Sequence, residues 1–147
     1  MEIERKYLVA ALPEDIRDFP FSDLEQVYLS KEPVIRLRRS EDRYELTVKG
    51  AGLLAREELN LPLTEEQYEH LCTKKEGAPI RKRRYRIPCG EYMIELDVFH
   101  GKQEGLLLAE VEFPTLEEAE AFLPPEWFGE EVTYDPRYQN VSLAYGF

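Results

Sequence analysis

Charged and apolar residues alternate with a period of two along most of this 147-residue chain, and the pattern predicts a fold made mainly of β-strands. Residues 64–76 and 115–121 instead begin like helices, because a threonine precedes a glutamine or glutamate by three residues, as in a capping box. A short terminal helix is expected near 137–145. We predict one mainly β (α+β) domain over residues 1–147, with strands at 2–9, 24–30, 34–39, 43–49, 55–61, 80–87, 92–99 and 106–113.

The charged residues of these strands share one parity, while the opposite parity is largely apolar. A sheet or sandwich would bury its apolar face and expose the charged face to solvent. A closed barrel would instead turn the charged rows inward to line a tunnel, with helices covering its apolar outer face. Exposed strands usually mix in Thr, Ser and Gln, so rows made almost wholly of charged residues favour the tunnel. The rows are Glu2, Glu4, Lys6; Arg36, Arg38; Glu45, Thr47, Lys49; Arg56, Glu58, Asn60; Lys82, Arg84, Arg86; Glu95, Asp97; Glu110, Glu112.

Basic residues are concentrated locally in a chain that is acidic on average. The formal net charge is −11 and the pI is near 4.7. Both values argue against a general binder of nucleic-acid backbones, because such affinity comes from basic surfaces that release counterions. Basic residues nevertheless gather at 36–39 and 81–86. The sequence therefore predicts a local anion site and no nucleic-acid partner.

The composition is typical of a folded protein in a reducing compartment. A hydrophobic share of 43% and an aromatic share of 12% argue against disorder. No apolar run approaches the roughly 20 residues of a membrane span. Residues 1–6 also contain acids where a signal peptide would have a basic region and then an apolar one. Cys72 and Cys89 show no redox-pair spacing, and we expect a cytoplasmic protein that does not enter a membrane.

Two carboxylates and a lysine share one side of the first predicted strand. Glu2, Glu4 and Lys6 follow one another at about 6.6–6.8 Å along an extended chain. The carboxylates can then share in binding a hard divalent cation, while the lysine adds a positive charge for a phosphate. Glu110 and Glu112 repeat the acidic pair on a late strand. If these rows converge with the arginines, whose planar guanidinium suits phosphate oxygens, the carboxylates hold metal and the cations grip a linear polyphosphate.

The segment Glu2-Ile3-Glu4-Arg5-Lys6 resembles the ExExK signature of the CYTH superfamily, also called triphosphate tunnel metalloenzymes. The resemblance covers nearly the whole chain, because further segments follow in the family's order and the C-terminal tail is similar to that of the short bacterial members. These segments are Arg36-Leu37-Arg38, Thr47-Val48-Lys49, Lys82-Arg83-Arg84-Tyr85, Glu95-Leu96-Asp97-Val98-Phe99, Glu110-Val111-Glu112-Phe113, 127–133 and 135–140. The resemblance implies an eight-stranded antiparallel barrel with flanking helices, whose tunnel admits a triphosphate in the presence of Mg²⁺ or Mn²⁺.

Most short bacterial members resemble inorganic triphosphatases, so the implied activity is metal-dependent hydrolysis of inorganic triphosphate to pyrophosphate and phosphate. Asn60 departs from the family pattern, because related short members tend to carry a second glutamate there, and it is expected to face inward beside Glu58. The metal ligands that the resemblance implies are Glu2, Glu4, Glu110 and Glu112. The implied substrate-binding cations are Lys6, Arg36, Arg38, Lys49, Arg56, Lys82 and Arg84. The implied catalytic and supporting residues are Glu2, Glu4, Lys6, Glu58, Glu95 and Asp97.

Two other functions stay open at this point. An adenylyl cyclase or a thiamine or nucleoside triphosphatase would use the same fold but would need an additional pocket for its organic group. A non-catalytic polyphosphate-binding protein would gain nothing from carboxylates beside phosphate. The expected partner is a small-molecule triphosphate, and a homodimer is compatible with the sequence. Arg39 and Arg83 fall on the outward parity, where we expect ion pairs with the Glu-rich helices.

Overall fold

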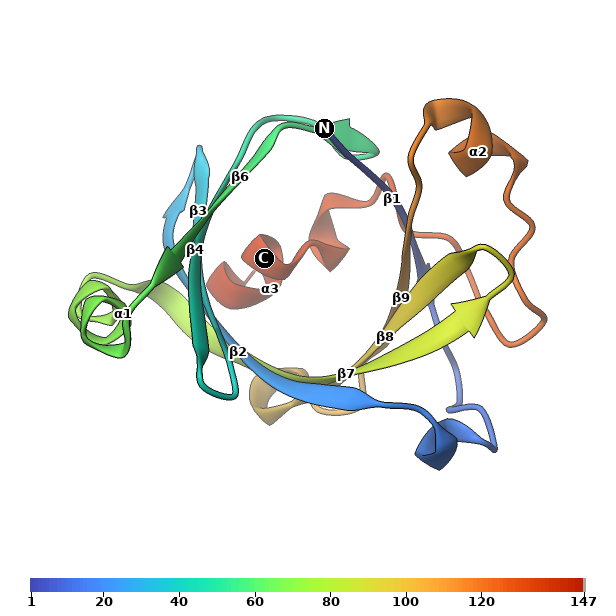
Figure 1. The fold of residues 1–147 in the computed structure, drawn as a ribbon, viewed down its shortest axis with the longest axis horizontal. Coiled ribbons are helices and arrows are strands. Elements are labelled where there is room, and N and C mark those ends of the chain that lie inside the picture. The colour runs from blue at the N-terminus through green and yellow to red at the C-terminus, as the bar shows by residue number, and fades with distance from the viewer. Residues whose placement is uncertain (147) are drawn as a thin grey trace.

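The computed structural model describes residues 1–146, in which an antiparallel sheet curls into a nearly closed barrel with short helices around it (Figure 1). Its strands neighbour one another in the order β5-β1-β9-β8-β7-β2-β3-β4-β6. The strands are β1 (Glu2–Leu8), β2 (Phe21–Lys31), β3 (Val34–Ser40), β4 (Arg43–Lys49), β5 (Ala55–Arg56), β6 (Glu58–Leu63), β7 (Glu76–Cys89), β8 (Tyr92–His100) and β9 (Leu107–Glu112). The helices are α1 (Glu65–Cys72), α2 (Leu116–Ala121) and α3 (Asn140–Tyr145), with 3₁₀ turns at Ile16–Asp18, Gly101–Gln103 and Pro136–Tyr138.

The barrel architecture is confirmed, but the predicted strand at 55–61 is divided in two. Ala55 pairs with Ile3 of β1, whereas β6 pairs along its whole length with β4. The chain changes its pairing partner at Glu57, because this segment has to reach strands on both sides of the seam where the sheet closes. The sheet therefore has nine strands rather than eight, and one residue joins its two edge strands.

The helices differ from the prediction at their ends. The helix expected over 64–76 ends at Cys72, because Glu76 already pairs with Tyr28 of β2. The terminal helix expected near 137–145 is a 3₁₀ turn followed by α3. Both capping threonines are confirmed, since each side chain accepts a hydrogen bond from the backbone N–H three residues on. Within residues 1–146, every helix is too short or too polar to cross a membrane.

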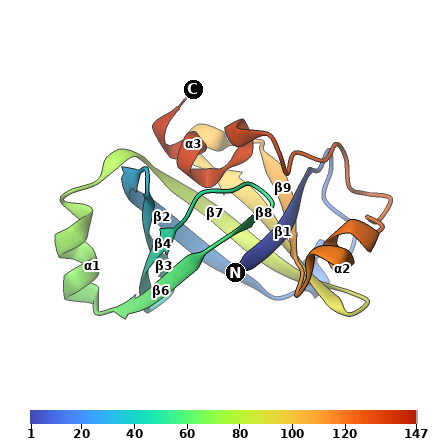
Figure 2. The same ribbon diagram turned by 90° about the horizontal axis from the view of Figure 1, so that it is seen from above.

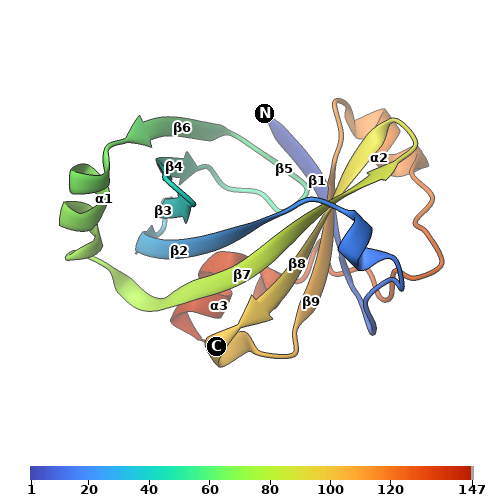
Figure 3. The same ribbon diagram turned by 60° about the horizontal axis from the view of Figure 1, so that its bottom comes forward.

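Most of the apolar parity faces outward and is buried under the helices. The outer face of β1, β8 and β9 packs against α2 through Val111, Phe113 and Ala119, and Leu37 of β3 packs against α1 through Tyr68. Figure 3 shows α1 and α2 on opposite sides of the barrel. The helices leave part of the outer face uncovered, because Leu59 and Leu61 on β6 are 68% and 55% exposed.

At one end of the barrel, the inward-facing rows change from charged to apolar. Leu108 continues the row of Glu110 on β9, and Phe99 continues the row of Asp97 on β8. These side chains pack against α3, which lies across this end of the barrel (Figures 1 and 2). We call this cluster the apolar plug; its members are Ile80, Phe99, Leu108, Val141 and Ala144.

The outward-facing arginines have partners on neighbouring strands, so the prediction that they pair with helices is wrong. Asp23 lies opposite Arg83 in the register of β2 and β7, and their side chains are 2.9 Å apart. The Arg83 guanidinium also lies 4.0 Å from the centre of the Phe21 ring, and Arg39 lies 5.8 Å from that of Tyr44. An adjacent strand offers a partner at a fixed position in the register, as Asp23 does for Arg83.

One buried hydroxyl gives a direct test of the packing. The Tyr7 side chain packs against Phe128, but its hydroxyl has no hydrogen-bond partner among residues 1–146. Tyr7→Phe is therefore expected to leave the free energy of unfolding unchanged or to raise it slightly, because no hydrogen bond is lost. In the matched control Tyr68→Phe, loss of the 3.0 Å hydrogen bond to the Glu25 carboxylate is expected to cost about 1.5–3 kcal/mol. Urea unfolding of both variants measures the difference, and a larger loss for Tyr7→Phe would contradict this assignment.

Candidate active site

The inward-facing charged rows surround a cavity of about 220 Å³ inside the barrel. Glu4, Arg38, Lys49 and Glu112 come from four different strands and all line this cavity, so the predicted inward orientation is confirmed. The formal charges of the cavity wall nearly cancel, although most of its lining residues are charged. Its wall holds seven carboxylates and six cations, namely Glu2, Glu4, Glu45, Glu58, Glu95, Glu110 and Glu112, and Lys6, Arg36, Arg38, Lys49, Arg56 and Arg84.

Acidic residues face one another across neighbouring strands. Glu4 of β1 lies opposite Glu112 of β9, and Glu110 of β9 lies opposite Glu95 of β8. Lys6 lies opposite Glu110 in the same register, and its Nζ is 3.5 Å from the Glu110 carboxylate. Like charges directly opposite one another destabilise a sheet. This side of the cavity therefore gains stability from any positive charge brought into it.

The pKa values of these acids follow from burial and from their neighbours. Burial, followed by the charge of Glu110, raises the pKa of Glu4 to about 8. Burial also raises the pKa values of Glu2 and Glu112. Burial alone would raise the pKa of Glu110 as well, but Lys6 and other cations hold it well below its usual range. Without an added cation, Glu4 thus keeps a proton while Glu110 is ionised.

This proton makes the stability of the metal-free protein depend on pH. Unfolding releases Glu4 to its ordinary pKa of 4.5, whereas the folded protein keeps the proton up to about pH 8. The contribution of Glu4 to stability therefore falls as the pH rises between these values. Glu4→Gln removes that loss, so we expect a melting temperature above that of the wild type at pH 8 and equal to it at pH 4.5. Melting in the presence of a chelator, with the exposed Glu104→Gln as control, checks this; a gain of equal size at both pH values would contradict it.

Two arginines on β3 carry positive charge into the cavity, and neither forms an ion pair with an acidic side chain among residues 1–146. Arg36 is 4% exposed; it donates to Thr47 Oγ1 at 3.1 Å, and its Nε has no partner among residues 1–146. Arg38 Nε donates to the side-chain oxygen of Gln26 at 2.8 Å. Burial, followed by the charges of Arg36 and Arg84, lowers the pKa of Arg38 to about 9. Buried cations are normally paired, so this part of the wall is suited to an anion.

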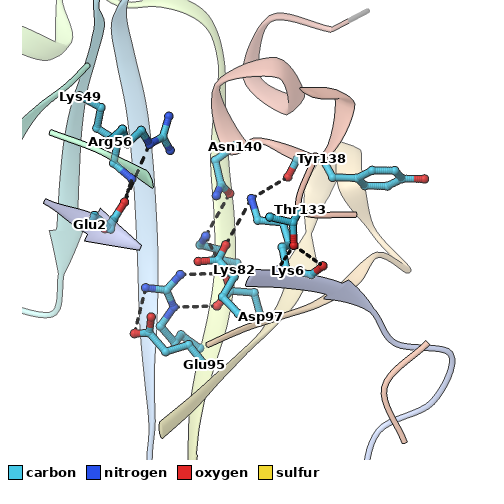
Figure 4. A network of polar contacts seen from close by, with 12 residues as sticks. Glu2, Lys6, Lys49, Arg56, Lys82, Glu95, Asp97, Thr133, Tyr138 and Asn140 are labelled. Carbon is cyan, nitrogen blue, oxygen red and sulfur yellow. Dashed lines mark hydrogen bonds and ion pairs between the residues drawn. The ribbon is translucent and has the colours of Figure 1, made fainter. Parts of the chain in front are cut away.

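Other cations of the cavity are bound to carboxylates at the seam of the barrel (Figure 4). Lys49 Nζ lies 3.3 Å from Glu2 Oε1 and 3.8 Å from Glu58 Oε1, and Arg56 Nε lies 3.9 Å from Glu2 Oε1. These pairs join β1 to β4 and β5, and they join β4 to β6. Asn60 also lines the cavity, and it accepts a hydrogen bond from Thr47 at 2.6 Å.

Two predicted site residues, Lys82 and Asp97, lie behind the cavity wall. Their side chains are 0% and 1% exposed and form an ion pair of 2.7 Å. Asp97 also accepts hydrogen bonds from Arg84 at 2.8 and 2.9 Å, and Arg84 reaches Glu95 at 3.2 Å (Figure 4). Burial lowers the pKa of Lys82 to about 7. In this geometry Asp97 orients Arg84, which does line the cavity, while the predicted contact of Lys82 with substrate stays a prediction.

A family model of the CYTH domain matches residues 1–143. The chain belongs to the CYTH family. An inorganic triphosphatase of Nitrosomonas europaea is 43% identical to this CYTH protein over 149 residues, covering 97% of this chain and 96% of that protein. An inorganic triphosphatase of Acetivibrio thermocellus is 39% identical over 123 residues, covering 80% and 76%.

Solved structures agree with this assignment. The crystal structure of the inorganic triphosphatase NE1496 superposes on this CYTH protein with a TM-score of 0.74 at 38% identity, covering all of this chain and 96% of that one. The structure of HpAC1 from Hippeastrum has a TM-score of 0.63 at 14% identity, which shows the fold alone. The predicted family and tunnel fold are thus confirmed.

Several residues that line the cavity of this CYTH protein have no assigned role in the predicted site. Tyr28 and Glu45 lie on strands, and Gln139 and Asn140 belong to the C-terminal segment. Glu45 is part of the predicted charged row that contains Lys49, but no function is assigned to it from the sequence. Gln139 and Asn140 follow a stretch without periodicity, and no local pattern places such residues inside a barrel.

Proposed function

We propose that this protein hydrolyses inorganic triphosphate to pyrophosphate and phosphate. The observation that carries the proposal is the pair Arg36 and Arg38. In the described part of the chain they have no acidic ion-pair partner, and they bring positive charge into a barrel cavity that is also lined by rows of carboxylates. A small, highly charged cavity suits a compact polyanion. The inorganic triphosphatases that match most of the chain support the same substrate.

The cationic side chains bind and orient the phosphate chain in this proposal. Arginine donates paired N–H groups to phosphate oxygens, and Arg84 is fixed for this purpose by Asp97 behind it. Water attacks a terminal phosphorus atom, the P–O bond to the bridging oxygen breaks, and pyrophosphate departs. The negative charge that develops on the leaving group is stabilised by the cations already placed around it. The proposed substrate-binding residues are Lys6, Arg36, Arg38, Lys49, Arg56 and Arg84, which all line the cavity, whereas Lys82 lies behind the wall and is paired with Asp97.

The acidic rows fit a divalent cation that is bound together with the substrate. Among residues 1–146, no three acidic, histidine or cysteine side chains form a ready-made metal site. Mg²⁺ commonly needs only one or two carboxylates in addition to substrate phosphates. Glu2, Glu4, Glu110 and Glu112 would supply the carboxylates, and the bound Mg²⁺ or Mn²⁺ would neutralise phosphate charge and activate water. Glu58 and Glu95 hold the cations Lys49 and Arg84 in position.

Phosphate release from a panel of substrates tests the function. We expect turnover of inorganic triphosphate with Mg²⁺ or Mn²⁺, little turnover of ATP, thiamine triphosphate or pyrophosphate, and none with a chelator. Tight binding of triphosphate without turnover would instead support a binding protein, and faster turnover of ATP would support a nucleotide-directed enzyme. The cytoplasmic location, the absence of a nucleic-acid partner and the homodimer stay predictions.

A further inference from the structure

At the end of the barrel that α3 covers, the contact with Lys82 determines which way the side-chain amide of Asn140 is turned. Lys82 Nζ lies 3.0 Å from Asn140 Oδ1 at the start of α3 (Figure 4). An ammonium group can only donate hydrogen bonds, so the oxygen of Asn140 has to face Lys82. The NH₂ group of Asn140 is consequently turned away from Lys82.

The orientation of the Asn140 amide is fixed, because the Lys82 side chain is held in place. Its ammonium is paired with Asp97 at 2.7 Å, and both side chains are almost completely buried. Asn140 itself lines the cavity, whereas Lys82 does not. The NH₂ group of Asn140 has no acceptor among residues 1–146, so it is available to a ligand in the cavity.

A positive charge lies at the same end. Lys6 Nζ donates to the carbonyl oxygen of Tyr138 at 3.0 Å, two residues before Asn140, and also lines the cavity. A phosphate group at this end therefore meets the ammonium of Lys6 and the amide of Asn140 together. Val141 of the apolar plug lines the cavity directly after Asn140, so the cavity is bounded by apolar side chains here and the group that reaches this end is the end of a chain.

We propose that Asn140 is a specificity-determining residue, whose NH₂ group donates to an oxygen of the unesterified terminal phosphate of a linear inorganic polyphosphate. The assignment rests on the proposed function and adds a subsite to it. The proposed contact involves the side-chain NH₂ group of Asn140 and no backbone N–H group of α3. A neutral donor suits this position, since a carboxylate would repel the phosphate and a second ammonium would compete with Lys82 for Asp97.

Two substitutions at this position separate direct donation from a purely structural role. Asn140→Asp keeps the size of the side chain and an oxygen for Lys82, but it replaces the donor with a negative charge. Asn140→Ala removes the donor and the contact with Lys82. Ser142→Ala is the control, because Ser142 lies on the same helix and does not line the cavity. Melting temperatures confirm that each variant is folded.

Calorimetric titration with metal-free tripolyphosphate gives the dissociation constants, and turnover with Mg²⁺ gives kcat and KM. We expect affinity to fall about 10-fold for Asn140→Ala, the equivalent of one hydrogen bond to a charged group, and further for Asn140→Asp. Ser142→Ala should match the wild type. The order wild type, Ala, Asp supports the proposal.

Other orders overturn it. If Asn140 only positions Lys82, Asn140→Asp will bind as tightly as the wild type and Asn140→Ala will bind more weakly. Equal affinities for all three proteins would likewise remove any role for Asn140. A wild type that neither binds nor cleaves tripolyphosphate would overturn the proposed function itself, which distinguishes that failure from a failure of this assignment alone.

Discussion

Glu4→Ala is expected to lower kcat for inorganic triphosphate by at least about 100-fold. Loss of a residue that only supports a metal ligand costs up to about 100-fold, and loss of a metal ligand itself should cost at least as much. Glu4 lines the cavity opposite Glu112 and is proposed to bind the divalent cation. A carboxylate repels a bare polyanion and assists it only through metal. Its removal should therefore affect the transition state much more than the binding of triphosphate.

Measurement of kcat and KM across a range of Mg²⁺ concentrations, together with the metal-free dissociation constant of triphosphate, tests this expectation. Arg38→Ala provides the contrast, because loss of a direct phosphate contact should weaken binding as well as turnover. Glu104→Ala, an exposed carboxylate outside the cavity, should behave like the wild type. Wild-type activity of Glu4→Ala at saturating Mg²⁺ would remove Glu4 from the proposed metal site.

Asp97→Ala is expected to be the most destabilising of the substitutions considered. Asp97 is 1% exposed and compensates two buried cations, Lys82 at 2.7 Å and Arg84 at 2.8 Å. Its removal leaves Lys82 buried without its acidic partner and leaves Arg84 with Glu95 alone, and breaking a buried pair in this way typically costs about 3–5 kcal/mol. At roughly 2–4 °C per kcal/mol for a chain of this size, the melting temperature should fall by on the order of 10 °C.

Asp23→Ala is the matched control for Asp97→Ala. Asp23 also pairs with an arginine at 2.9 Å, but its side chain is 60% exposed and the partner Arg83 is 38% exposed. Exposed pairs of this kind contribute about 0–1 kcal/mol. Thermal or denaturant unfolding of both variants measures the difference. Similar losses for the two would show that burial of Asp97 does not set its importance.

The inward orientation of the charged rows was predictable because side-chain parity is a local property of a strand. Glu4, Arg38, Lys49 and Glu112 each reveal their face from the residues beside them. The division of the predicted strand at Glu57 was not predictable in this way, since it depends on which strands meet at the seam. Alternation within one segment contains no information about its neighbours.

The position of Lys82 shows a second limit of the sequence pattern. Lys82 and Arg84 have the same parity, so the pattern assigns both to the cavity. In the structure α3 covers Lys82 through Asn140, while Arg84 stays at the cavity wall. Parity determines which side of the sheet a residue faces, but it does not show what packs there from a distant part of the chain.

The apolar plug closes one end of the barrel, so the cavity does not run through it. Substrate and products then enter and leave the proposed active site at the other end of β9, where Glu112 is exposed. With the proposed subsite at Asn140, the fragment nearer the mouth would depart before the fragment beside Asn140, and a new substrate would wait for both. The order of product release is therefore set by position along a single blind channel.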